Sequence, residues 1–207
     1  MAIGDPYATI LELKGYAEHM SDTTDDTQLT EVMLQASRAV EHYCQRQFNK
    51  ATSATAKIFY PSSLYVACVE DFWTTASLAI ATDEGNDGVY ELTWTSSDYQ
   101  LEPINQVVDG ETGWPYYRIR AVGTSKRFPF TYLDARAPLQ VTAQWGWNAV
   151  PTNVKVATIY LAMETFKLRG APFGVANTDQ FGPIRVRDNP KVMNMLAPYR
   201  LAPVLVA

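Results

Sequence analysis

Apolar positions in the first fifty residues recur at spacings of three and four, the period of an amphipathic helix. The clearest stripe predicts a helix that begins after a cap at Thr24 or Asp25 and runs to about Gln47. A shorter helix is expected before it, because Thr9 and Glu12 have the spacing of a capping box. The two segments together predict a hairpin of antiparallel helices.

The period changes beyond residue 50, where short runs rich in β-branched and aromatic residues alternate with turn-forming residues. This pattern predicts a small antiparallel sheet, sandwich or partial barrel inserted between helices. The expected strands are Ala56–Tyr60, Leu64–Val69, Thr74–Ala81, Val89–Trp94, Trp114–Val122 and Leu139–Trp145, and Ser97–Pro103 is expected as another edge segment.

A third helix is predicted from Val154 to Leu168, and its surface is apolar almost all the way round. Such a helix has to be covered on several sides, so a neighbouring subunit is one expected source of cover. Gly170 ends the helix. A short last helix is expected over Pro190–Leu196, with Asp188 or Asn189 as its cap.

These elements predict an α+β fold. Its helical core would combine a helix hairpin with a long third helix, from residues 1–50 and 150–207, and would end in an extended C-terminal tail. Residues 51–149 would form a small inserted antiparallel β domain.

The composition is that of an ordinary globular protein, with 207 residues, 47% hydrophobic and 19% charged. The net charge of -5 argues against a surface that grips a nucleic-acid duplex, which needs a face rich in lysine and arginine. Two cysteines, Cys44 and Cys68, are too few for a disulfide framework and are expected to be reduced. The sequence predicts neither a signal peptide nor a membrane span.

Candidate chemistry is sparse. Asp83–Asp87 could be read as a calcium loop, but Gly85 and Trp94 occupy positions where an EF-hand places ligands, so a hairpin turn is favoured. His42 and Cys44 lie close together without a second such pair to complete a zinc site. No nucleophile motif or phosphate-binding glycine pattern occurs. We therefore expect no catalytic residue, no metal and no cofactor, and we expect that the protein is not an enzyme.

The tryptophans allow two interpretations. They could form a stacking surface for sugars or bases, or they could fill a small β core or a seam between subunits, which is favoured. All of them fall in or beside predicted strands: Trp73, Trp94, Trp114, Trp145 and Trp147.

The order of the elements resembles that of the head–tail connector (adaptor) proteins of long-tailed bacteriophages. The similarity extends over nearly the whole chain. The order and spacing of the matching segments are more specific than any one segment alone. The segments that carry it are Tyr7–Lys14, Asp22–Asp26, Ala36–Phe48, Asp98–Tyr99 with Leu101 and Pro103, Val141–Trp147 with Val150–Pro151, Phe166–Arg169, Ala171–Val175 and Leu196–Arg200.

This resemblance implies a structural virion protein, made in the host cytoplasm and located in the neck. It implies a ring of about a dozen copies that docks on the portal protein and contacts stopper or tail-side proteins, while DNA passes through the lumen. An acidic chain suits a channel that repels phosphate. Neither membrane binding nor sequence-specific DNA binding is expected.

Two sets of residues are candidates for these contacts. On the third helix, an interface between subunits is expected at Tyr160, Met163 and Phe166. In the C-terminal part, portal docking is expected at Arg185, Arg187, Tyr199 and Arg200, although the arginines could equally be solvated surface charges.

Two other functions remain open from the sequence alone. The first is a carbohydrate-binding module of a tail or baseplate, which would use aromatic side chains of the β domain. The second is a small hydrolase that uses a pair of carboxylates, although nothing in the sequence singles out two of them.

Overall fold

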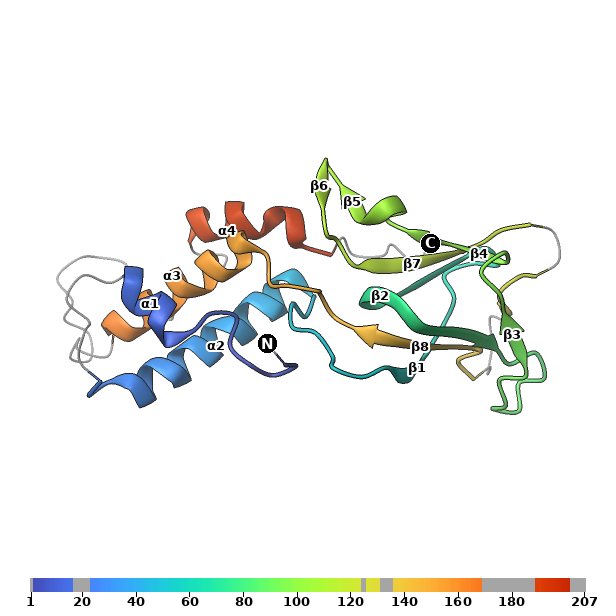
Figure 1. The fold of residues 1–207 in the computed structure, drawn as a ribbon, viewed down its shortest axis with the longest axis horizontal. Helices are drawn as coiled ribbons and strands as arrows, with labels where there is room; N and C mark the ends of the chain where they lie inside the picture. Colours follow the sequence, from blue (N-terminus) through green and yellow to red (C-terminus); the bar gives the residue numbers. More distant parts are fainter. Residues whose placement is uncertain (1, 17–22, 124–125, 131–135, 169–188, 202–207) are drawn as a thin grey trace. The chain divides into compact units, whose positions relative to one another are not determined.

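A computed structural model describes residues 2–16, 23–123, 126–130, 136–168 and 189–201. The chain divides into two compact units (Figure 1). We call Ile3–Asn49 together with Ala149–Pro203 the helical unit, and Lys50–Asn148 the β unit.

The helical unit contains the four α-helices found in the described part of the chain, and α3 packs against the other three. A 3₁₀ turn, Ala197–Tyr199, follows the last of them. The helices are α1 (Ile10–Tyr16), α2 (Asp26–Cys44), α3 (Thr152–Leu168) and α4 (Pro190–Leu196).

Two helix starts predicted from the sequence are confirmed. At α1 the Glu12 carboxylate accepts from the Thr9 amide at 2.8 Å, and the Thr9 hydroxyl accepts from the Glu12 amide at 3.2 Å, which is a capping box. At α4 the Asn189 side chain accepts from the Val192 amide at 3.2 Å. Helix α2 ends at Cys44, earlier than predicted, because Gln45 has the left-handed conformation with φ 54°.

The β unit is built on a six-stranded antiparallel sheet in the order β1–β8–β2–β7–β4, with β3 paired to β2 (Figure 1). A separate hairpin joins β5 and β6, and a 3₁₀ segment, Ile104–Gln106, precedes it. The strands are β1 (Thr55–Phe59), β2 (Val66–Thr82), β3 (Leu92–Trp94), β4 (Tyr99–Glu102), β5 (Val107–Val108), β6 (Glu111–Thr112), β7 (Tyr116–Ala121) and β8 (Leu139–Trp145).

One face of this sheet forms an aromatic-rich core. Along β8, the buried residues Leu139, Val141, Ala143 and Trp145 alternate with half-buried polar ones, which is the pattern of a strand with one covered face. Trp94 stacks on Phe128 with ring centroids 4.5 Å apart and planes 9° apart.

The fold class expected from the sequence is wrong. The structure is mostly a large antiparallel sheet with four helices, rather than a helical core that carries a small β insertion. The third helix is not the long element that was expected, because α3 has 17 residues and α2 has 19.

The main reason for this error is β2. Leu64–Val69 and Thr74–Ala81 were expected to be separate short strands, but Val66–Thr82 is one strand of 17 residues with shifts in register along it. The polar residue Asp71 lies inside this strand and not in a turn. It is buried, and its carboxylate accepts from the indole of Trp147 at 2.8 Å. Long-range pairing therefore keeps the strand continuous where the local sequence indicates a break.

Candidate interaction surfaces

The outer face of the sheet, opposite the aromatic core, differs between its two halves. In the β7–β4 half, register places Gln100 opposite Arg120 and Glu102 opposite Arg118. The Glu102 carboxylate accepts from Arg120 Nε at 2.6 Å and from Arg118 Nη1 at 3.4 Å. We call this the charged half. The hydrogen bond from Arg120 is the main reason that the pKa of Glu102 is lowered.

The other half of the outer face crosses β1, β8 and β2, and we call it the uncharged face. Register aligns its residues in two rows, Ile58–Gln140–Ala81 and Ala56–Thr142–Ala79, and Thr93 of β3 stands opposite Ala81. None of these side chains carries a charge. Such a surface lacks the ionic partners that the charged half provides.

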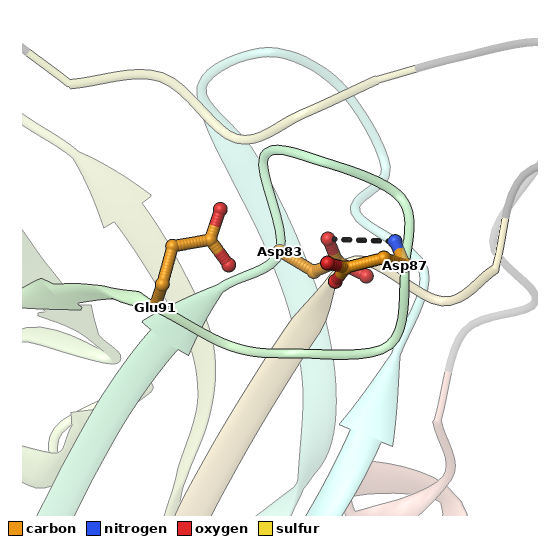
Figure 2. A group of neighbouring side chains, drawn as sticks. All are labelled: Asp83, Asp87 and Glu91. Carbon is orange, nitrogen blue, oxygen red and sulfur yellow. Dashed lines mark hydrogen bonds between the residues drawn. The ribbon is translucent and has the colours of Figure 1, made fainter.

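A cluster of carboxylates lies in the loop after β2 (Figure 2). Oxygens of Asp83, Asp87 and Glu91 lie within 4.8 Å of one another. Asp83 is only 2% exposed, and its two oxygens accept from the Asp87 amide at 3.3 Å and from the Gly88 amide at 2.7 Å. These bonds close the loop from within, and Asp87 adds an Asx turn by accepting from the Val89 amide at 2.8 Å.

The loop is also closed by Arg136, which donates from Nη1 to the Asp87 carbonyl at 2.6 Å and from its amide to the Asn86 side chain at 2.9 Å. At Gly88, with φ +91°, a Cβ would lie 2.5 Å from that guanidinium. Hard cations such as calcium bind oxygen ligands of this kind. Because the Asp83 oxygens are already hydrogen-bonded to the backbone, the cluster is explained by the loop itself.

Buried polar contacts fix the N-terminal segment onto α2 in the helical unit. Tyr7 is fully buried, its hydroxyl donates to the Glu41 carboxylate, and the same oxygen accepts from the Phe48 amide at 3.0 Å. The Tyr7 amide donates to the Ser37 hydroxyl at 3.0 Å. Burial is the main reason that the pKa of Tyr7 is raised, because it disfavours the charged phenolate.

The described residues of the C-terminal segment pack on the end of α2. The Leu201 amide donates to the Cys44 carbonyl at 2.9 Å, and the Tyr199 ring meets Phe48 edge-on at 6.0 Å. The Arg200 guanidinium lies 5.6 Å from the centroid of the Tyr43 ring. Burial raises the pKa of the Cys44 thiol to about 12, so this thiol is protonated at neutral pH.

The expected portal-docking residues therefore have different locations. Tyr199 is 5% exposed within the helical unit, whereas Arg200 is exposed. Arg185 and Arg187 lie outside the described residues.

The residues expected at a subunit interface lie on α3 and differ in burial. Phe166 is buried, while Met163 and Tyr160 are partly exposed. The Tyr160 ring meets Tyr16 edge-on at 6.3 Å, and the Lys191 ammonium lies 4.5 Å from its centroid. Tyr160 is thus the center of a small aromatic and cationic group on the helical unit.

An open hollow of about 280 Å³ lies between the N-terminal segment and α2. Its apolar walls come from Pro6, Ala8, Ile10 and Met33. The polar residues that line it are Asp5, Thr9 and Thr30. Since Thr9 forms the capping box described above, the hollow is bordered by residues with a structural role.

Four of the five tryptophans are buried, and two of them, Trp94 and Trp145, belong to the core of the β unit. Trp94, Trp114, Trp145 and Trp147 are 2–6% exposed. Trp147 packs against Trp114 with ring centroids 5.0 Å apart. Rings with so little exposed area cannot stack on a sugar that approaches from solvent, which favours the core interpretation over the carbohydrate-binding one.

The charged half of the outer face was not predicted from the sequence. Its signal was present in Arg118 and Arg120, which stand two residues apart on a predicted strand and so share one face. What the sequence did not reveal was the partner, because Glu102 joins them only through the pairing of β4 with β7.

No described helix is long and apolar enough to cross a membrane.

Comparisons with known proteins give similarities in structure only. No protein-family model matches the chain, and no curated protein matches it. A chain in the neck of an empty gene transfer agent (GTA) particle, computed with C6 symmetry, has a TM-score of 0.54 and 17% identity, over 96% of this chain and 92% of that one. A chain in the virion of a native GTA particle has a TM-score of 0.50 and 16% identity over the same shares. At this identity the similarity establishes a shared fold.

Proposed function

We propose that this protein is a structural component of the neck of a phage-like particle. The observation that carries the proposal is the extent of the structural similarity, which covers 96% of this chain and 92% of a chain from a GTA neck. Both units therefore have counterparts in one neck chain. A match to a single common motif would cover much less of either chain.

We further infer that several copies assemble into a ring that docks on the portal, contacts stopper or tail-side proteins and lets DNA pass. Three features support this finer assignment. The order of elements resembles connector proteins, the net charge of -5 suits a channel that repels phosphate, and large apolar side chains are exposed on the single chain. Among them are Leu11 at 81% and Tyr60 at 66% exposure.

We also propose that the protein is not an enzyme and that it resides in the virion. In the described residues the most conspicuous carboxylate group, around Asp83, is occupied by backbone hydrogen bonds. This arrangement supports a structural role for the loop and not a catalytic one.

The direct test is to purify particles from a host that carries this gene and to locate the protein by mass spectrometry and electron cryomicroscopy of the neck. The expected result is a ring of density at the head–tail junction into which the helical and β units fit. Particles that form complete necks without this protein would overturn the proposal. For the finer assignment, the purified protein is mixed with portal-bearing heads, and it is expected to sediment with them and not with heads that lack portal.

A further inference from the structure

The uncharged face is unusual for a sheet surface that meets solvent. Exposed faces of antiparallel sheets usually carry polar and charged side chains, as the charged half of this same sheet does. In the chain as a whole, 19% of residues are charged. The two registered rows of the uncharged face nevertheless contain only alanine, isoleucine, threonine and glutamine.

This face is accessible on the single chain. Ala56 and Ala79 are exposed, Ile58 is 58% exposed, and Tyr60, just after β1, is 66% exposed. Depletion of charge with exposed aliphatic and aromatic groups is the composition of the center of a protein interface. The face therefore has the character of a contact surface.

Charge indicates which partner fits. Each copy of the chain carries a net charge of -5, so copies repel one another where acidic groups would meet. A face without charges is a surface through which a second copy can approach without unpaired or like charges being buried. A basic protein or a nucleic acid would find no ionic partner on it.

The edge of the sheet is less suited to contact than the face. Within the described residues, β1 is the terminal strand in the sheet order, so its outer edge is open. Lys57, in the middle of this strand, binds Glu70 at 2.5 Å and lies 5.0 Å from the centroid of the Trp145 ring. A charged side chain in an edge strand opposes strand-to-strand pairing between molecules. None of the six residues in the two rows of the uncharged face carries a charge that would oppose contact in this way.

We propose that the uncharged face is the surface through which one copy of this chain contacts a second copy. The inference rests on the proposed function, since a neck component present in several copies needs such a contact, and it names the surface that provides the contact.

The test compares two matched substitutions at exposed strand positions of the outer face. Ala79→Glu introduces a carboxylate on the uncharged face, and Gln100→Glu introduces the same group opposite Arg120 in the charged half. Self-association of wild type and both variants is measured by sedimentation velocity, alone and on portal-bearing heads. Tryptophan fluorescence during denaturation checks that each variant is folded, and Ala56→Glu replaces Ala79→Glu if the latter is not.

The proposal expects that Ala79→Glu weakens self-association by at least about tenfold, because the contact would then bury a carboxylate without an ionic partner, while Gln100→Glu assembles as wild type does. A folded Ala79→Glu or Ala56→Glu protein that assembles as wild type does would overturn this inference and leave the proposed function standing. Wild-type protein that forms no assembly in either condition would overturn both.

Discussion

The helical unit and the β unit organise their polar interactions differently. In the helical unit, the buried hydrogen bonds of Tyr7 join residues 30 to 41 positions apart in sequence. In the β unit, strand pairing and packed aromatic rings join the distant segments first. Long-range side-chain bonds, such as that from the Trp147 indole to Asp71, add to this pairing, while Asp83 bonds amides only four and five positions away.

This difference follows from the backbone. A sheet sets the register of distant segments through its own ladder of hydrogen bonds, so its side chains can serve local turns. Helices satisfy their backbone internally and leave the position of a neighbouring segment to side chains. Specific polar contacts such as those of Tyr7 then decide where the N-terminal segment lies.

The unfolding of each unit can be measured separately. All five tryptophans belong to the β unit, so tryptophan fluorescence reports its unfolding. The four helices belong to the helical unit, so circular dichroism of helices reports that unit.

The largest effect is expected for Phe72→Ala in the β core. Phe72 is fully buried, with its ring centroid 5.4 Å from Tyr116 and 6.2 Å from Trp145. The lost contacts and the cavity should lower the free energy of unfolding by about 3–5 kcal/mol. The fluorescence transition should shift to lower denaturant and the helical signal should shift less, while Tyr60→Ala at an exposed site should change neither. Equal shifts of both signals would mean that the units unfold together.

Tyr7→Phe is the corresponding test in the helical unit. It removes the hydroxyl that donates to Glu41 and accepts from the Phe48 amide, while Glu41 keeps its ion pair with Arg38 at 3.0 Å. The expected cost is about 1–3 kcal/mol, seen in the helical signal and not in tryptophan fluorescence. Tyr16→Phe, at a 51% exposed ring, is the matched control and should cost little.

The raised pKa of Tyr7 adds a pH signature to this test. The neutral hydroxyl stabilises the fold below its ordinary pKa of 10.0, and this contribution falls as the pH rises above that value. Tyr7→Phe should remove that part of the alkaline loss of stability. An unchanged alkaline profile would contradict the role assigned to the hydroxyl.

Asp83→Ala should cost about 1–2 kcal/mol, because the amides of Asp87 and Gly88 lose their acceptor in a partly exposed loop. The shift is expected in fluorescence, which reports the unit that contains the loop. Calcium should leave the wild-type transition unchanged. A calcium-dependent stabilisation that Asp83→Ala abolishes would show that the cluster binds a cation and does not only fasten the loop.

The smallest effects are expected from acid. The pKa of Asp98 is lowered to about 2, first by its hydrogen bond with Lys126, and that of Glu102 is lowered, first by Arg120. Both carboxylates therefore contribute stability above their ordinary pKa values of 3.8 and 4.5, and the contribution is lost as the pH falls through the lowered values.

Glu102→Gln should change stability at neutral pH by less than about 1 kcal/mol, because Arg118 and Arg120 are partly exposed. The fluorescence-detected midpoint of this variant should depend less on pH below 4.5 than that of wild type. The same acid dependence in both proteins would exclude Glu102 as its source.

Local signals in the sequence were reliable where a few neighbouring residues decide the structure. The capping box of Thr9 and Glu12 and the Asn189 cap depend on residues three positions apart, and both are present. The alternation along Leu139–Trp145 was also read correctly, because each position reports only which face it occupies.

Local sequence signals do not predict the structure where residues distant in the chain determine it. Asp71 lies inside β2 and not in a turn, and the Trp147 indole that binds its carboxylate is 76 positions away. The difference between the charged half and the uncharged face appears only once register aligns Ala79 with Thr142 and Glu102 with Arg118. Both errors concern pairing, which a single strand does not encode by itself.

The discontinuity of the helical unit has a consequence for synthesis on the ribosome. Residues 3–49 emerge before the β unit, but the helix α3 against which α1 and α2 pack follows only after the whole β unit. At about 5–20 residues per second, the first helices wait about 6–25 seconds for that partner to be complete. During this interval the nascent chain exposes the apolar stripe of α2, which makes it a candidate client for ribosome-associated chaperones until translation passes residue 168.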